Sequence, residues 1–359
     1  MSVMHAAPEH PAPDRSSRGK KRKNGFTLSG RPAFRRRSVM KLLSITASVS
    51  ARRAFKGPLL PGWSWDLETA NAFLQEQMRY AFALPSMADA REYLDSLLFA
   101  PIDDPPVEVQ PSAAGEPAGQ WFIPRDHADG PVVLYLHGGG YAFSSHSHLP
   151  MIKLFADASK VRTFALAYRL TPEHPYPAQL DDAMGAYRWL LQKGTDPSRI
   201  VLAGDSAGGH LVLTALMEIR KLGLPRPAGG IGLCPWTHCG RTGASLFGND
   251  RYDWVQGAMA VKFGEWLVGN TGRSLESVSP GLGDLKGLAP IYVQAGDKEI
   301  LHDMILEFVA AARSQGAEIM CDVWKNMTHD FQAYGSMLVE SREALKRYGE
   351  VVNQWTLPA

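Results

Sequence analysis

The sequence contains few cysteines and no long apolar segment. Among its 359 residues there are three cysteines, which are too few and too irregularly spaced for a disulfide framework or a zinc site. A reducing compartment is therefore expected, and the cytoplasm is the predicted location. No segment approaches the roughly 18 consecutive apolar residues of a membrane-spanning helix, so no span is expected. The three cysteines are Cys234, Cys239 and Cys321.

Two common cofactor signatures are also missing. No Gly-x-Gly-x-x-Gly pattern follows a strand-like segment, which argues against an enzyme that binds a dinucleotide. No group of His, Cys and Asp residues has the spacing of metal ligands. We therefore expect neither a cofactor nor a metal.

Charge is present but unevenly distributed. Charged residues make up 21% of the chain and apolar residues 45%, as in ordinary soluble globular proteins, and the net charge is +2. Residues 1–60 contain 14 Lys and Arg against two Asp and Glu, so the rest of the chain is acidic. Residues 1–30 show no hydrophobic period and are predicted to form a disordered basic tail. No nucleic acid partner is expected, and any membrane-surface contact of this tail would be weak.

Helical periodicity begins near residue 35. Apolar residues recur at helical spacing over 39–49, 67–80 and 89–98, so residues 31–100 are predicted to form a helical N-terminal cap. Residues 35–45 also resemble a twin-arginine export signal, because paired arginines precede a short apolar run. Export through this segment is the minor alternative to a cytoplasmic location.

Strand-like and helix-like segments alternate through the rest of the chain, after a proline-rich passage over 102–119. Such alternation predicts a mostly parallel central sheet with helices on both faces. The stretch 237–287 interrupts the rhythm and is interpreted as an insertion that contributes to the cap. The predicted strands are 132–136, 163–168, 200–203, 229–234, 291–295 and 319–324, and the predicted helices are 149–159, 178–191, 211–220, 303–313 and 334–355.

The motif that the rest of the chain surrounds is Gly204-Asp205-Ser206-Ala207-Gly208. The pentapeptide alone also occurs in plain glycine-rich turns. Here it lies between a predicted strand and a predicted helix, which is the context of a nucleophile elbow. Ser206 is therefore the candidate nucleophile, and Asp205 is interpreted as a structural residue that braces the turn.

A second glycine-rich motif, His137-Gly138-Gly139-Gly140, directly follows another predicted strand. Backbone N–H groups of such a loop can face a substrate oxygen and stabilise the anion formed when a carbonyl is attacked. The predicted oxyanion hole consists of Gly138, Gly139 and Ala207. His137 is expected to brace the loop. The nearby His146 and His148 are expected to face solvent, and the alternative is that they line the pocket.

Together these motifs resemble the hormone-sensitive-lipase group of α/β-hydrolases, whose bacterial members are mostly carboxylesterases. The resemblance is strong over about 100–359 and weaker over 35–98. It implies an α/β-hydrolase fold with a catalytic domain over 101–359, a helical cap, a Ser–His–acid triad and no cofactor. The matching segments are 137–141, 168–178, 181–182, 204–209, 234–236 and 327–331.

The resemblance also indicates the base and the acid of the triad. His329 lies in the family's histidine motif, after the last predicted strand, and is the candidate base. The family's usual Asp-Pro-Leu motif is replaced by Asp297-Lys298-Glu299-Ile300-Leu301, and matching Leu301 places Glu299 at the acid position. Glu can replace Asp in this role. Asp297 and Asp303 remain alternatives, Asp303 being otherwise expected as a helix N-cap.

These residues predict a serine hydrolase that cleaves carboxylic esters of small to medium acyl chain through an acyl-enzyme on Ser206. Three alternatives remain open. An amidase or deacetylase, or a lactonase, would use the same triad, because all pass through the same tetrahedral anion. A ligand-binding protein on a non-catalytic hydrolase scaffold and a membrane-surface protein are alternatives of another class. The expected partner is a small-molecule ester, and the protein is expected to be a monomer or a homodimer.

Overall fold

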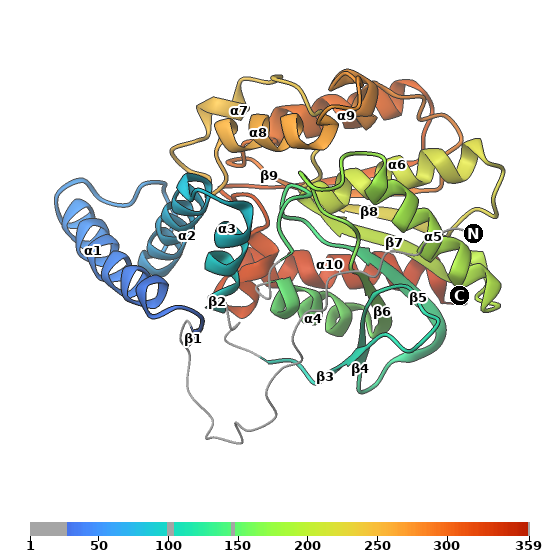
Figure 1. Cartoon of the computed structure of the whole chain (residues 1–359), viewed down its shortest axis with the longest axis horizontal. Helices are drawn as coiled ribbons and strands as arrows, with labels where there is room; N and C mark the ends of the chain where they lie inside the picture. Colours follow the sequence, from blue (N-terminus) through green and yellow to red (C-terminus); the bar gives the residue numbers. More distant parts are fainter. Residues whose placement is uncertain (1–26, 99–103, 145–147, 358–359) are drawn as a thin grey trace.

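The computed structural model describes residues 27–98, 104–144 and 148–357. Figure 1 shows a central sheet with helices on both faces and a group of N-terminal helices beside it. The predicted tail over 1–30 falls almost entirely outside the described residues. Among the described helices, none combines the length and the apolar composition needed to cross a bilayer.

The eight-stranded sheet has the order β10-β9-β8-β7-β5-β6-β4-β3. Strands β5 to β10 pair in parallel, whereas β4 pairs antiparallel with both β3 and β6. Strands β7, β8 and β9 are buried along their whole length, which explains their continuous apolar sequences. The bounds are β3 Val107–Pro111, β4 Gly119–Pro124, β5 Ala128–Leu136, β6 Val161–Leu166, β7 Ile200–Asp205, β8 Gly229–Leu233, β9 Ile291–Gly296 and β10 Ile319–Trp324.

Helices cover the two faces of the sheet. Helices α4 (His148–Ser159) and α10 (Val339–Thr356) pack together against one face. On the other face lie α5 (Ala178–Gln192), α6 (Ser206–Lys221) and α9 (His302–Ser314). The predicted fold class, a mostly parallel sheet covered on both sides, is confirmed.

Strands β3 and β4 were not predicted from the sequence, and one predicted helix was wrong. The proline-rich passage 102–119 contains β3, an edge strand that tolerates Pro111 at its end. The helix predicted over 334–355 is interrupted. A 3₁₀ helix over Phe331–Met337 ends at Leu338, whose extended backbone (φ −121°, ψ 141°) separates it from α10. Gly335 lies in the left-handed region at φ 53°, which glycine adopts without steric cost.

Three helices make up the N-terminal segment, which was predicted to be a cap: α1 (Pro32–Lys56), α2 (Trp65–Ala83) and α3 (Met87–Asp95). Ser64 and Ser86 cap α2 and α3 by accepting hydrogen bonds from the backbone amides of Leu67 and Asp89, the third residue of each helix. Ion pairs from Arg52 and Arg53 to the buried carboxylate of Glu68 join α1 to α2. A short antiparallel pair of β1 (Thr27–Leu28) and β2 (Leu97–Leu98) closes the group.

The stretch 237–287 contains α7 (Ser245–Gly248) and α8 (Gly257–Val268). Aromatic side chains connect it to the N-terminal helices. Phe82 of α2 stacks on Trp266 with ring centroids 5.7 Å apart and meets Phe263 edge-on at 5.1 Å. The insertion and the N-terminal helices are therefore in direct contact, and α2 and α8 lie near each other in Figure 1.

Candidate active site

Ser206 lies at the junction of β7 and α6, where the chain turns sharply. Its backbone is in the left-handed region (φ 53°), a conformation that non-glycine residues adopt rarely. A Cβ at Gly208 would collide with the carbonyl of Leu136 on the neighbouring strand. The motif glycines are therefore needed for the close approach of helix and strand. Ser206 consequently projects from the N-terminus of α6, where backbone N–H groups favour negative charge.

The glycine loop after β5 is braced from two sides. His137 donates a hydrogen bond from Nδ1 to the carbonyl of Gly138 (2.8 Å) and stacks on Tyr168. The Asp205 carboxylate accepts hydrogen bonds from the Gly138 amide (3.0 Å) and from the Tyr135 hydroxyl (2.7 Å). Asp205 thus has the bracing contacts that the sequence predicted.

The same contact corrects the predicted oxyanion hole. Because the Gly138 N–H already donates to Asp205, it is not free to bind a substrate oxygen. Gly139 and Gly140 line the same cavity as Ser206. The backbone amides of Gly139 and Gly140 are therefore the candidate donors of the oxyanion hole in this loop, and that of Gly138 is not.

Of the three carboxylates that the sequence proposed, Glu299 is the one beside His329. Glu299 Oε2 lies 2.9 Å from Nδ1 of His329, and both side chains are buried. Asp297 instead accepts a hydrogen bond from the Asn326 amide. Asp303 accepts one from the amide of Ser245, the first residue of α7, so it braces that helix and does not cap its own.

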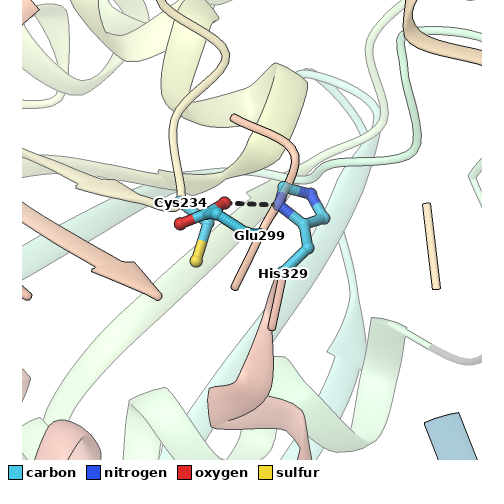
Figure 2. A group of neighbouring side chains, drawn as sticks. All are labelled: Cys234, Glu299 and His329. Carbon is cyan, nitrogen blue, oxygen red and sulfur yellow. Dashed lines mark hydrogen bonds and ion pairs between the residues drawn. The ribbon is translucent and has the colours of Figure 1, made fainter. Parts of the chain in front are cut away.

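Glu299 is fixed by more than His329. Its Oε1 accepts a hydrogen bond from the Gly296 amide at the end of β9 (2.8 Å). Figure 2 shows the Cys234 thiol on the far side of the same carboxylate. Burial raises the pKa of Cys234 well above its usual value, and the charges of Glu299 and Asp330 raise it further. The thiol is therefore neutral, and its S–H group is only a weak hydrogen-bond donor.

Cys234, Glu299 and His329 present donor atoms within 4.8 Å of one another, and zinc accepts all three donor types. The group was not predicted, because its members come from three segments that are distant in the sequence. Both oxygens of Glu299 and Nδ1 of His329 are already hydrogen-bonded. A cation would have to displace these bonds, so the contacts fit an acid–base pair better than a metal centre.

The insertion supplies contacts that sequence reasoning missed. The buried carboxylate of Asp253 accepts hydrogen bonds from the amides of Ile300 (2.7 Å) and His329 (3.2 Å). Trp254 donates from its indole N–H to the carbonyl of His329, and Asn249 donates to the carbonyl of Glu299. The insertion therefore fixes the backbone of both loops, and no local pattern marks residues that act over such sequence distances.

Asp253 is also unusual in its ionisation. Burial raises the pKa of its carboxyl to about 7, although the charge of His329 and the hydrogen bonds from the Ile300 and His329 amides act in the opposite direction. Three carboxyl groups, those of Asp253, Glu299 and Asp330, thus surround one imidazole.

Ser206 and His329 line one cavity of about 160 Å³, and most of its other lining residues are apolar. The lining comes from the sheet edge, from the insertion and from the N-terminal helices. His148, which the sequence placed in solvent, is part of the lining, whereas His146 lies outside the described residues. The apolar lining residues of the N-terminal segment are Leu74, Met78, Leu94 and Leu97.

Comparison with known proteins shows to which family a chain with this arrangement belongs. Residues 133–333 match the alpha/beta hydrolase fold family. The chain is 36% identical over 253 residues to an acetyl-hydrolase of Streptomyces hygroscopicus, covering 70% of this chain and 84% of the relative. It is 34% identical to a solved esterase of the bacterial hormone-sensitive lipase family, with a TM-score of 0.74. The match covers 82% of this chain and 99% of that esterase. The chain belongs to this alpha/beta hydrolase family.

Another structural neighbour in the family is EstE5, in crystals soaked with p-nitrophenyl butyrate. It is 29% identical to this hydrolase, covers 89% of this chain and 99% of its own, and has a TM-score of 0.71. The similarity therefore extends beyond residues 133–333, which match the family. A match over 89% of the chain is longer than residues 101–359, so it includes part of the N-terminal segment.

In this hydrolase Nε2 of His329 faces the carboxyl group of Asp330. Within the described part of the chain, the Ser206 hydroxyl forms no hydrogen bond with His329, and Nε2 lies 3.4 Å from Oδ2 of Asp330. Burial alone would lower the pKa of His329, but the carboxylates of Asp330, Glu299 and Asp253 raise it to about 10. Catalytic hydrogen bonds are often long without substrate, so this geometry is compatible with Ser206 and His329 acting together.

Proposed function

We propose that this hydrolase is a serine esterase that cleaves carboxylic esters of small to medium acyl chain through an acyl-enzyme on Ser206. The observation that supports it most directly is the common cavity. A serine on a strained strand–helix turn and a histidine oriented by a buried carboxylate line the same apolar space. A serine hydroxyl is a weak nucleophile and needs such a neighbouring base.

The proposed reaction begins when Ser206 attacks the ester carbonyl while Nε2 of His329 takes its proton. The amides of Gly139 and Ala207, with Gly140 as a further donor, stabilise the resulting anion. His329 then gives the proton to the leaving alcohol, and a water activated by His329 hydrolyses the acyl-enzyme. Glu299 keeps the imidazole in the required tautomer and stabilises its charge.

The cavity also supports the proposed acyl length. Its volume of about 160 Å³ and its apolar lining suit a short hydrocarbon chain and exclude a long extended one without rearrangement. Because Leu74, Met78 and Leu94 contribute to the lining, we propose that residues 31–100 act as the cap over the site.

The test is hydrolysis of p-nitrophenyl esters of increasing acyl length by the wild type, Ser206→Ala and Ser277→Ala. Ser277 is exposed on the insertion and serves as the matched control. We expect turnover by the wild type and Ser277→Ala, highest for short and medium chains, and loss of nearly all turnover in Ser206→Ala. A fluorophosphonate probe should label the wild type at Ser206. Turnover by Ser206→Ala at the wild-type rate would refute the proposal.

A further inference from the structure

The mechanism above leaves one buried polar group of the cavity unused. Asp330 lines the cavity and is 7% exposed, yet its Oδ1 is buried without a hydrogen-bond partner among the described residues. Leaving a buried polar atom unpaired is unfavourable, and it is more so for a charged group. An oxygen in this state marks a place where a polar group of a ligand would be accommodated.

The position of Asp330 indicates which part of the substrate would meet it. Its other oxygen, Oδ2, lies 3.4 Å from Nε2 of His329. In the proposed reaction Nε2 gives its proton to the oxygen of the leaving alcohol. Asp330 therefore lies on the leaving-group side, within reach of atoms only a few bonds from the ester oxygen.

The chemistry of the site selects the kind of group. A hydroxyl both donates and accepts hydrogen bonds, so it satisfies the carboxyl of Asp330 whether that carboxyl is ionised or protonated. An ammonium group fits less well, because His329 already supplies the positive charge that faces Asp330. An alkyl group offers no hydrogen bond and would leave the carboxyl of Asp330 without a partner.

We propose that Asp330 binds a hydroxyl on the second carbon from the ester oxygen, so that the preferred substrates are monoesters of vicinal diols. Asp330 would then be a specificity residue of the leaving-group pocket. This inference rests on the proposed esterase function.

The first test needs no variant. 2-Hydroxyethyl butanoate and propyl butanoate have the same acyl group and leaving alcohols with the same number of non-hydrogen atoms, and they differ in one terminal hydroxyl. A hydrogen bond to a charged group contributes about 1.5–3 kcal/mol, which corresponds to about a 10- to 100-fold preference. We expect the wild-type kcat/KM to be higher for the hydroxyethyl ester by such a factor. Equal values for the two esters would overturn the inference.

The second test removes the carboxyl. Asp330 lies in the left-handed region (φ 49°, ψ 35°), which glycine adopts without strain, so Asp330→Gly is the variant least disturbing to the loop. Because Asp330 faces His329, both esters should change in absolute rate, but the hydroxyethyl-to-propyl ratio should fall to about one. Asp297→Asn, a carboxyl variant outside the cavity lining, should keep the wild-type ratio.

The outcomes separate the two proposals. An unchanged ratio in Asp330→Gly, with both esters still hydrolysed, overturns the role of Asp330 and leaves the esterase function intact. Failure of the wild type to hydrolyse either ester, or equal rates in Ser206→Ala, overturns the esterase function and this inference together.

Discussion

Each carboxylate near β9 has a different partner, and the partners predict what each substitution does. Glu299 contacts Nδ1 of His329, Asp297 binds the Asn326 amide and Asp303 binds the Ser245 amide. Glu299→Gln should lower kcat by on the order of 10⁴, the loss seen when the orienting acid of a serine-protease triad is replaced. Steady-state kinetics on a p-nitrophenyl ester measure it.

Asp297→Asn and Asp303→Asn are the matched controls, since each keeps its size and loses only charge. We expect both to reduce kcat by no more than a few-fold while Tm falls modestly. A collapse of kcat in Asp297→Asn, with Glu299→Gln close to wild type, would move the orienting role to Asp297.

The carboxylates around His329 also predict the pH dependence. They raise the pKa of His329 to about 10, above its usual 6.5. A general base must be neutral, so kcat/KM should rise with pH through the alkaline range, with its acid limb above pH 7. The same shift stabilises the folded protein below about pH 6.5, and this stabilisation is lost as the pH rises through about 10.

Rates measured between pH 6 and 10 test this dependence. Asp330→Asn removes one of the charges that raise the pKa of His329, so it should move the acid limb to lower pH. An acid limb at or below pH 6.5 in the wild type would contradict the expected electrostatics.

Among the single residues of the site, those that belong to a sequence motif could be predicted. Ser206 and His329 were found from short patterns, and the structure brings them to one cavity. Gly138 was misassigned, because a glycine motif does not reveal which of its amides is already bonded. Asp253 and Asp330 were missed, because their importance depends on burial and on neighbours distant in sequence.

Among the elements, the insertion has the most direct effect on the site. Asp253 accepts hydrogen bonds from the backbone amides of Ile300 and His329, one in each of the two loops that carry Glu299 and His329. Asp253→Ala would leave these amides buried and unpaired, at about 1–3 kcal/mol each. We therefore expect a lower Tm and a lower kcat, with a smaller effect on KM.

Asp284→Ala is the control for Asp253→Ala, because Asp284 is also in the stretch 237–287 but pairs at the surface with Arg220. Thermal unfolding and kinetics of the two variants should differ clearly. If Asp253→Ala and Asp284→Ala behave alike, the insertion does not fix the loops through Asp253.

The elements themselves were predictable where burial is complete. Strand β7 and helix α5 begin at the predicted residues, because their apolar patterns have no competing interpretation. β3 was missed, since an edge strand with few buried residues has a weak pattern. The break before α10 was missed because Gly335 is a single residue in an otherwise helical sequence.

At the scale of the whole molecule, the position of the N-terminal helices predicts how removal of N-terminal residues affects activity and solubility. All residues that line the cavity belong to 74–334, within the described part of the chain. Removing residues 1–26 should therefore leave kcat/KM for a p-nitrophenyl ester close to that of the full chain. Removing residues 1–98 should expose the apolar surface under α1 to α3 and cause aggregation and loss of activity.

Size-exclusion chromatography and kinetics of the two truncated chains measure these outcomes. Loss of activity on removal of residues 1–26 alone would show that the basic N-terminal segment contributes to the folded enzyme. A monodisperse, active chain starting at residue 99 would show that the N-terminal helices are not needed to cover the cavity.

The three contacts from the insertion have a consequence for altering this enzyme by directed evolution. Asn249 and Asp253 fix main-chain atoms of the two loops and do not line the cavity, whereas Val255, Ala260 and Phe263 line it. Anchoring and selectivity are thus assigned to different positions of one short segment. A combinatorial library that randomises the second set and keeps the first constant should yield many folded variants with new substrate ranges, whereas one that randomises the first set should yield mostly inactive chains.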